Sequence, residues 1–246
     1  MITYFIPIFN EYKKNKQLFK IFLNKLKKEI NKNNNSKFII INDGSDDKSD
    51  TLVKNLLKKI NIKNNRKVLY LKNSKNRGIG YSFKKSLKHC KTKFICPIPS
   101  DNDLPFVNPK KILKKNVDHV IFFPINIEKY SLGRFFLSVM FRLIYNIIFN
   151  LRVHYIQGSF IANVKHAKKI NIQSNRFTFW AEINLKLLKM GLNYIDYPLY
   201  FNNESKLDRT VSLKNFLEIV ISLILLIFEI YFSNKKKYNK KPVKIY

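Results

Sequence analysis

The sequence predicts an α/β fold with an open, mostly parallel sheet between flanking helices. Over the first half of the chain, short apolar runs rich in β-branched and aromatic residues alternate with stretches of helical periodicity. Three polar side chains, Asn10, Asp43 and Asp101, lie just past the ends of three of the apolar runs. Because open parallel sheets bind ligands beyond the carboxyl ends of their strands, this coincidence favours a ligand site at that edge.

The expected elements follow one another in regular order. The first strand is expected at 2–9, and apolar side chains at three- and four-residue spacing predict an amphipathic helix over 19–30. A second helix is expected over 52–60, and "NRGIGYSFKKSLKHC" opens a third. The remaining strands of this half are expected at 38–41, 68–71, 94–98 and 120–124.

Two long apolar stretches distinguish the second half. Residues 132–151 are rich in aromatics and carry their polar residues on one helical face (Arg134, Ser138, Arg142, Tyr145 and Asn146). This pattern favours a helix lying in a membrane interface, with an amphipathic core helix as the alternative. Residues 216–232 are slightly shorter than the roughly 20 residues of a membrane span. We interpret them as an interfacial or marginally spanning helix with a lysine-rich cytoplasmic flank, "SNKKKYNKK", and a soluble helix remains the alternative.

The expected organisation is therefore a catalytic domain over 1–210 and a membrane-associated helix with a basic tail over 211–246. The formal net charge of +31 points either to a polyanionic partner or to compositional drift, since Lys, Asn and Ile are all over-used. Nucleic acid is a poor candidate for that partner, because the aromatics sit in apolar runs and no reading motif occurs. The two cysteines suggest neither a disulfide framework nor a zinc site, and the N-terminus lacks the basic start of a signal peptide.

Four polar loops converge on the predicted ligand edge. They are "PIFNE" at 7–11, "INDGSDD" at 41–47, "NRGIGYS" at 76–82 and "SDND" at 100–103. Asp43 stands where a carboxylate could bind a base or ribose, although a simple capping turn has the same residues. The glycine loop lacks the Lys-Ser/Thr of a P-loop. Asp101 and Asp103 flank Asn102, and paired carboxylates at a strand end suit Mg²⁺ or Mn²⁺.

Taken in order, these four motifs resemble the family-2 inverting glycosyltransferases. The likeness is greatest to the branch of dolichyl-phosphate mannose synthases and bacterial polyprenyl-phosphate sugar transferases, and it covers about residues 3–109. The resemblance implies the glycosyltransferase A fold, a nucleotide-binding α/β sheet. It also implies site residues: Pro7, Asn10, Glu11, Asp43, Gly78 and Asp101 at the nucleotide sugar, with Asp101 and Asp103 on the metal and Asp103 in catalysis.

The later segments match the family more loosely. By resemblance, Arg134 is a catalytic arginine, and Arg209 and Lys214 contact the acceptor phosphate. Three departures stand out: Asn42 replaces an acid, "FFP" at 122–124 replaces a phosphate-binding "GSR", and an expected acid falls near His154. Glu182 in "FWAEI" lies in the region where other family-2 enzymes carry a general base, and a helix-surface acid is the alternative.

The sequence thus predicts a metal-dependent inverting glycosyltransferase at the cytoplasmic face of a membrane. Its donor would be a GDP- or UDP-linked sugar, its cofactor Mg²⁺ or Mn²⁺, and its acceptor a polyprenyl phosphate on an anionic membrane surface. A glycan hydroxyl as acceptor is the first alternative, and it requires a carboxylate base. A non-catalytic relative and a basic nucleic-acid-binding protein are the alternatives from other classes.

Overall fold

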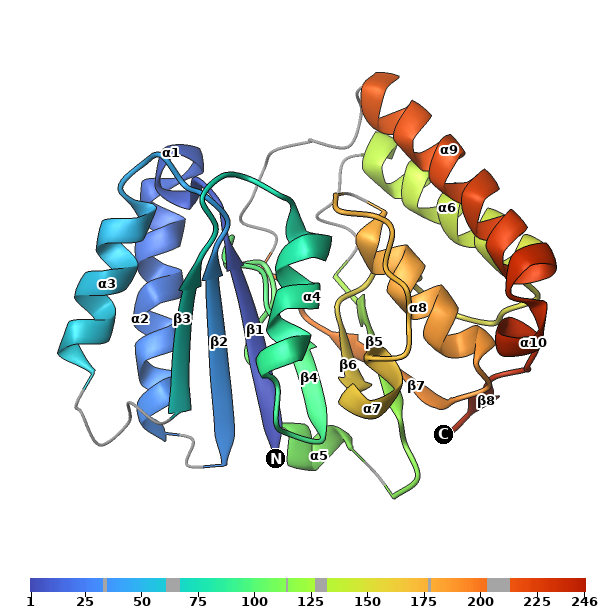
Figure 1. The fold of residues 1–246 in the computed structure, drawn as a ribbon, viewed down its shortest axis with the longest axis horizontal. Coiled ribbons are helices and arrows are strands. Elements are labelled where there is room, and N and C mark those ends of the chain that lie inside the picture. Colours follow the sequence, from blue (N-terminus) through green and yellow to red (C-terminus); the bar gives the residue numbers. More distant parts are fainter. Residues whose placement is uncertain (33–34, 61–66, 114, 127–131, 177, 203–212) are drawn as a thin grey trace. The chain divides into compact units, whose positions relative to one another are not determined.

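The computed structural model divides the chain into two compact units, Met1–Val107 and Asn108–Tyr246. It describes residues 1–32, 35–60, 67–113, 115–126, 132–176, 178–202 and 213–246. Figure 1 shows the elements of both units.

The first unit is built on four parallel strands. They are β1 (Ile2–Ile8), β2 (Ser36–Asn42), β3 (Val68–Lys72) and β4 (Phe94–Pro97), in the spatial order β3-β2-β1-β4. All four were expected from the sequence, with bounds that differ by one or two residues. Phe5, Ile6, Ile40 and Ile41 are fully buried, because strands covered on both faces are apolar almost throughout.

Helices cover both faces of these strands. The helices are α1 (Glu11–Lys14), α2 (Lys16–Lys32), α3 (Ser49–Lys59) and α4 (Ile79–His89). In Figure 1, α2 and α3 lie together on one face and α4 covers the opposite face. This arrangement follows from right-handed crossovers, since β1 to β3 step outward in one direction and the chain then returns to β4. The expected helix over 19–30 is confirmed, and it buries Phe19, Phe22, Leu23, Leu26 and Ile30.

The second unit carries four further strands. They are β5 (His119–Pro124), β6 (Phe160–Asn163), β7 (Asn193–Leu199) and β8 (Val243–Lys244), in the order β6-β5-β7-β8. β6 is antiparallel to β5, while β7 and β8 run parallel to it and to each other. The helices are α5 (Pro109–Ile112), α6 (Leu132–Phe149), α7 (Val164–Ala167), α8 (Phe179–Lys189), α9 (Leu213–Phe228), a π-helical turn (Glu229–Ser233) and α10 (Lys235–Tyr238).

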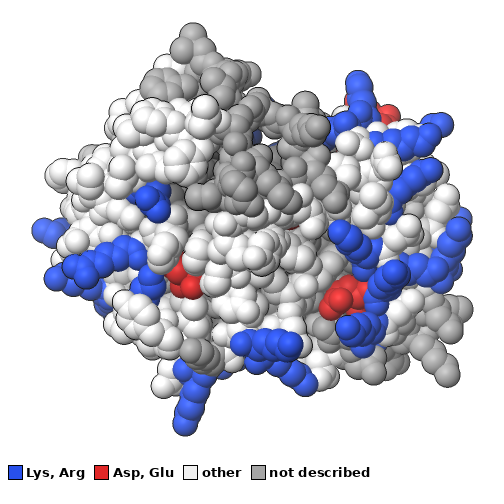
Figure 2. All heavy atoms as spheres, turned by 180° about the vertical axis from the view of Figure 1, so that it is seen from behind, with Lys and Arg blue, Asp and Glu red and all other residues white. Residues whose placement is uncertain are grey.

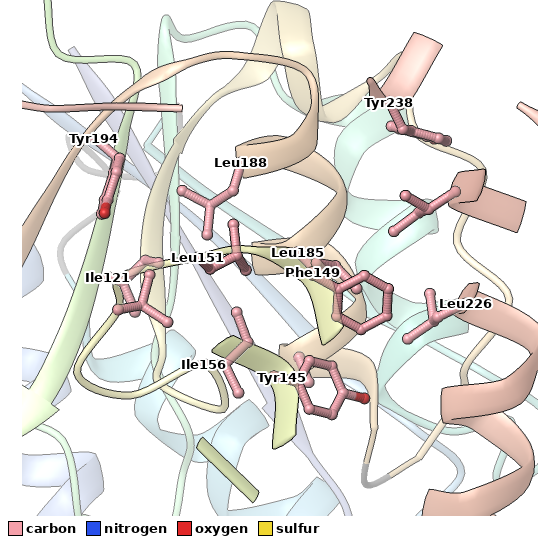
Figure 3. Packing of buried hydrophobic residues seen from close by; sticks show 13 residues of the cluster. Ile121, Tyr145, Phe149, Leu151, Ile156, Leu185, Leu188, Tyr194, Leu226 and Tyr238 are labelled. Atoms are coloured by element: carbon pink, nitrogen blue, oxygen red, sulfur yellow. The ribbon is translucent and has the colours of Figure 1, made fainter. Parts of the chain in front are cut away.

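The core of the second unit joins α6, α8 and the C-terminal segment. Tyr145 and Phe149 from α6 pack with Leu185 from α8 and with Leu226 and Tyr238 from the C-terminal segment (Figure 3). α6 and α9 lie side by side in Figure 1, and the Tyr231 hydroxyl, just after α9, donates a hydrogen bond to the Ile148 carbonyl at 2.5 Å. The described part of 211–246 is therefore packed into the second unit.

A buried ion cluster fastens this C-terminal segment to α8. The Lys186 ammonium lies 2.6 Å from Glu182 Oε1 and 2.7 Å from Glu229 Oε2, and its side chain is fully buried. It also donates a hydrogen bond to the Asn171 carbonyl at 2.7 Å. Three charges are thus held away from water, and each has a partner of opposite sign, which is the condition for tolerating such burial.

α6 and α9 turn apolar faces outward. On α6 the polar side is the inner one: Tyr145 is buried, and Asn146 exchanges hydrogen bonds with the Val153 backbone at 3.0 and 3.2 Å. The outward residues recur at three- and four-residue spacing and are Leu132, Phe136, Met140, Leu143 and Ile147 on α6, and Leu217, Ile221, Ile224, Phe228 and Phe232 on α9 and the turn after it. We call these ten residues the apolar outer face. Among the helices that the structure describes, none combines the length and apolar character needed to cross a membrane.

Candidate active site

The loops after β1 and β2 are joined by hydrogen bonds at the carboxyl ends of the strands. Asn10 has φ 51°, a left-handed conformation that Asn adopts more readily than most residues. Its backbone N–H donates to Ser45 Oγ at 3.1 Å, and its Oδ1 accepts from the Asp46 N–H at 3.0 Å. Asn10 therefore acts as a spacer that fixes the distance between two of the four predicted loops.

Asp43 organises the glycine loop. Its carboxylate is buried and accepts from Asn73 Nδ2 at 2.7 Å, from the Arg77 N–H at 3.1 Å and from the Gly78 N–H at 2.7 Å. Ser82 Oγ adds a fourth, weaker hydrogen bond at 3.3 Å. The sequence suggested either a nucleoside ligand or a capping turn, and the structure gives Asp43 a third task, holding the loop that precedes α4.

Gly44 allows the second and third loops to touch. It has φ +72°, and a Cβ atom built on it would lie 2.4 Å from the Lys75 carbonyl carbon and 2.7 Å from the Asn76 nitrogen. Any other residue here would adopt an unfavourable left-handed conformation, and its Cβ would clash with the backbone of Lys75 and Asn76, which has little room to move.

We expect Gly44→Ala to lower the free energy of unfolding by about 2–4 kcal/mol, because the left-handed conformation and overpacking each cost about 1–3 kcal/mol. Urea denaturation measures the loss. Gly133→Ala is the matched control, since Gly133 lies in α6 and a methyl group added to it would meet nothing within 4 Å. There alanine should stabilise by up to about 1 kcal/mol, as a better helix former. Equal effects of the two substitutions would contradict the close approach at Gly44.

The hydrogen bonds around Asn42 explain why an amide stands at this position instead of the acid expected from the family pattern. Asn42 is fully buried, its Nδ2 donates to the Tyr70 hydroxyl at 3.3 Å, and its Oδ1 accepts from the Ser45 N–H at 2.9 Å. Tyr70 gives its own proton to Asp50, which also pairs with Lys72 at 2.7 Å. Burial raises the pKa of Asp50, but the hydrogen bonds from Lys72 and Tyr70 outweigh it and hold that pKa well below its usual range. A carboxylate at position 42 could not form this hydrogen bond, because it has no N–H to donate and the Tyr70 hydroxyl already donates its proton to Asp50.

The paired aspartates stand in a tight turn after β4. The Ser100 hydroxyl donates to the Pro7 carbonyl at 2.7 Å and ties this turn to the end of β1. Asn102 is buried with φ 67°, and the Asp103 N–H donates to Asp101 Oδ1 at 3.1 Å. Both carboxylates are partly exposed. The left-handed residue between them turns the backbone and leaves Asp101 and Asp103 on one short loop.

These residues fit a divalent cation that shares its coordination with a substrate. In the described part of the chain, no three His, Cys, Asp or Glu side chains form a complete metal site. Mg²⁺ and related ions commonly take one or two carboxylates and complete their shell with water and substrate phosphates. Asp101 and Asp103 supply such a pair. Pro7 lies in β1 and its carbonyl accepts from Ser100, Gly78 lies in the glycine loop held by Asp43, and Glu11 pairs with Lys14 at 2.6 Å.

In the second unit, the carboxylate of Glu182 is occupied by hydrogen bonds and an ion pair within the chain. It is buried, its Oε1 accepts from the Gln173 N–H at 2.8 Å and its Oε2 from the Ser174 N–H at 2.7 Å, in addition to the Lys186 ion pair. A general base must present an oxygen to the acceptor proton, and both oxygens here already accept hydrogen bonds. Arg209 lies outside the described residues. Arg134 and Lys214 begin α6 and α9, but their side chains lie outside the described part.

Sequence reasoning missed a second acidic group, Asp196 on β7. Its side chain is buried, and its Oδ2 lies 2.8 Å from His154 Nδ1 and 2.9 Å from Lys244 Nζ. The His154 ring stacks on Phe123, part of the "FFP" segment, with centroids 4.7 Å apart. The only available signal was an acid inside the apolar run "YIDYPL".

A family model and several solved structures match the chain. The model described as glycosyl transferase family 2 matches residues 3–160. No curated protein sequence matches. Glucosyl-3-phosphoglycerate synthase from Mycobacterium tuberculosis, in complex with Mn²⁺, uridine diphosphate and phosphoglyceric acid, has a TM-score of 0.61 at 13% identity, over 93% of this chain and 78% of that chain.

Two further structures have the same architecture. The mannosyltransferase PcManGT from Pyrobaculum calidifontis, in complex with GDP-Man and Mn²⁺, has a TM-score of 0.61 at 12% identity, covering 95% of this chain and 64% of that chain. TarS 1–349 from S. aureus has a TM-score of 0.58 at 15% identity, covering 92% of this chain and 65% of that chain. At these identities the likeness concerns the fold, and it confirms the predicted glycosyltransferase A architecture.

Proposed function

We infer the function from one premise: the chain belongs to glycosyl transferase family 2 and is a glycosyltransferase. We propose that it moves a sugar from a GDP- or UDP-linked donor to a polyprenyl phosphate at the cytoplasmic face of a membrane, with inversion at the anomeric carbon. The main support for a lipid acceptor is the apolar outer face of α6 and α9, which no other described residue covers.

The donor half of the proposal rests on the first unit. Asp43 fixes the glycine loop, Asn10 fixes the spacing of the first two loops, and Asp101 and Asp103 offer their carboxylates beside the end of β1. A Mg²⁺ or Mn²⁺ ion bound by these two carboxylates supplies positive charge that stabilises the departing nucleoside diphosphate. Because the carboxylates are positioned before the donor arrives, little reorganisation is needed at the moment of transfer.

The environment of Glu182 supports a phosphate acceptor. A sugar hydroxyl needs a base to remove its proton, whereas a polyprenyl phosphate is already an anion near neutral pH. Glu182, the base suggested by the sequence, is committed to Lys186 and to two backbone N–H groups. Arg134, Arg209 and Lys214 remain the proposed cations for the acceptor phosphate.

The second candidate acceptor, a sugar hydroxyl, is favoured by one observation. His154 is about half exposed, and its Nδ1 faces the buried carboxylate of Asp196. An imidazole oriented by a carboxylate in this way can accept a proton through its other ring nitrogen. A His154→Gln enzyme that loses transfer to a sugar hydroxyl would support this candidate, and transfer to polyprenyl phosphate at the wild-type rate would support the phosphate acceptor.

The membrane surface is the proposed partner of the second unit. Monomeric proteins in water rarely expose apolar areas of this extent, and interfacial helices bury such faces at the boundary of headgroups and acyl chains. Lys235, Lys236, Lys240 and Lys241 are exposed just beyond Phe232, and each contributes about 1 kcal/mol near an anionic leaflet. In Figure 2, Lys and Arg are spread over much of the visible face, whereas its upper left, where α6 lies, is mainly uncharged.

We expect Ile147→Asp to weaken co-flotation with anionic vesicles about 10-fold or more, since burial of one isoleucine side chain contributes about 1.5–3 kcal/mol. Ile147 is 77% exposed, so the fold should be unaffected. Ile21→Asp, on the exposed side of α2, makes the same chemical change outside the apolar outer face. Equal weakening by both substitutions would mean that only net charge matters, which would exclude this face as the contact.

A donor panel tests the proposed reaction. Radiolabelled UDP- and GDP-linked sugars are incubated with Mn²⁺ and either polyprenyl phosphate or glycan acceptors, and the products are partitioned between water and organic solvent. Label in the organic phase that depends on polyprenyl phosphate supports the proposal. Label that appears only in a water-soluble glycan would replace it with the hydroxyl acceptor, and no transfer from any donor would favour a non-catalytic relative.

A further inference from the structure

The second unit contains a cavity of about 830 Å³ beside α9. This volume lies in the range of about 300–1,000 Å³ that is typical of small-molecule sites. One wall is formed by residues 173–176, Thr178 and Glu182, and the other is α9. The first wall includes Ser174, Arg176 and Glu182, and the second includes Leu217, Ile221 and Leu225.

The first wall is polar and rigidly held. Glu182 accepts from the N–H groups of Gln173 and Ser174, and Gln173 Nε2 donates to Glu229 at 3.1 Å. The Ser174 and Thr178 hydroxyls lie 2.7 Å apart. The buried ion cluster around Lys186 therefore shapes this wall through hydrogen bonds within the chain.

The second wall is mainly apolar, apart from Glu218 and Ser222, and is continuous with the apolar outer face. Leu217, Ile221 and Leu225 recur every four residues, and each is more than half exposed. Leu217 and Ile221 belong both to the cavity wall and to the surface that we propose to contact the bilayer. A hydrocarbon chain in that bilayer could therefore reach the cavity along α9 without crossing water.

The charges of the cavity argue against a nucleotide as its occupant. Its described lining carries one cation, Arg176, and two acids, Glu182 and Glu218. Lys186 compensates Glu182, but Glu218 remains on the α9 wall. A diphosphate would find no excess of positive charge among these residues to attract it. A neutral hydrocarbon chain carries no charge and needs no such attraction.

We propose that this cavity holds part of the isoprenoid chain of the acceptor lipid, an inference that rests on the proposed polyprenyl phosphate acceptor. The chain lies against Leu217, Ile221 and Leu225, and burial of its methylene groups provides affinity. The site therefore selects for chain length, because each isoprene unit that enters the cavity removes more apolar surface from water.

Binding of short lipid phosphates without detergent tests the proposal. Geranyl phosphate and farnesyl phosphate, both below their micellar concentrations, are titrated against the full chain by calorimetry. The wild-type protein should bind farnesyl phosphate at least about 5-fold more tightly than geranyl phosphate. In Ile221→Trp, which fills the cavity, the affinity for farnesyl phosphate should fall about 10-fold or more and the preference for the longer chain should disappear.

Val220→Trp provides the matched control. Val220 is a neighbouring, partly exposed residue of α9 that does not line the cavity, so this variant should bind farnesyl phosphate within about 2-fold of the wild type. Leu217→Trp is a second cavity-filling variant and should reproduce Ile221→Trp. Equal affinities of Ile221→Trp and Val220→Trp would overturn the assignment. A wild-type dimer that dissociates in Ile221→Trp would also overturn it, because a second copy would then occupy the groove.

The sugar-transfer assay keeps this inference separate from the reaction itself. Suppose that the wild-type enzyme glycosylates polyprenyl phosphate and that Ile221→Trp binds farnesyl phosphate as the wild type does. The proposed function would then stand, and the cavity would be excluded as the site of the isoprenoid chain. A wild-type enzyme that transfers no sugar to polyprenyl phosphate would reject the proposed function, and with it the acceptor role of the cavity. Loss of chain-length preference in Ile221→Trp together with active transfer by the wild type supports both.

Discussion

Asp103→Asn should slow sugar transfer by about 10³-fold, with little change in stability. The substitution keeps the size of the side chain and the backbone N–H that donates to Asp101 Oδ1, so the turn after β4 should persist. It removes one of the two carboxylates that we propose to hold the cation, and loss of a single charge-stabilising group at a transition state typically costs about 10²–10³ in kcat. Steady-state kinetics with the preferred donor measure the effect.

Metal binding provides an independent reading of the same variant. Free Mn²⁺ is followed by its electron paramagnetic resonance signal during titration with protein and nucleoside diphosphate, and Asp103→Asn should leave more Mn²⁺ free. Glu29→Gln on α2 also removes one acid and should behave as the wild type in both assays. Full activity and normal Mn²⁺ affinity in Asp103→Asn would place the metal elsewhere.

Lys186→Met should lower the free energy of unfolding by about 3–5 kcal/mol, the cost of leaving buried charges without their partner. Methionine fills a similar volume, but Glu182 and Glu229 would then face each other in the interior of the second unit. Chemical denaturation measures the loss. Lys54→Met removes one of the two lysine partners of Asp50, both of them exposed, and should cost less than about 1 kcal/mol.

A triple variant separates charge from packing. Combining Lys186→Met with Glu182→Gln and Glu229→Gln removes every charge of the cluster, and it should regain most of the stability lost in Lys186→Met. If the triple variant is as unstable as the single one, the loss comes from packing and the cluster contributes little through its charges.

The first unit was largely predictable because the apolar pattern of each element agrees with the order of strands and helices along the chain. Each strand is a short apolar run, the helices α2, α3 and α4 carry clear apolar stripes, and the polar loops fall at strand ends. The grouping of Asn10, Asp43 and the Asp101–Asp103 turn follows from this regular alternation. The particular duty of Asp43 could not be read in advance, since its partners Asn73, Arg77 and Gly78 are fixed only by the folded loop.

The second unit was less predictable for physical reasons. β6 and β8 have four and two residues, too few for a periodic signal, and β8 lies at the end of a lysine-rich tail. The four-residue spacing of Glu182 and Lys186 predicts an ion pair but not its burial, which depends on Glu229 arriving from a distant segment. For α6, periodicity identifies two faces, and only the tertiary structure decides that the polar one turns inward.

The orientation of α6 makes two properties of the protein independent. Its inward residues, such as Tyr145 and Phe149, belong to the core, whereas Phe136 and Ile147 are mainly exposed and add little to folding. Under the proposed membrane contact, substitutions at the outer positions can therefore change the affinity for a bilayer without destabilising the fold. The strength of the proposed membrane association can thus evolve by single substitutions of exposed side chains, separately from the stability of the second unit.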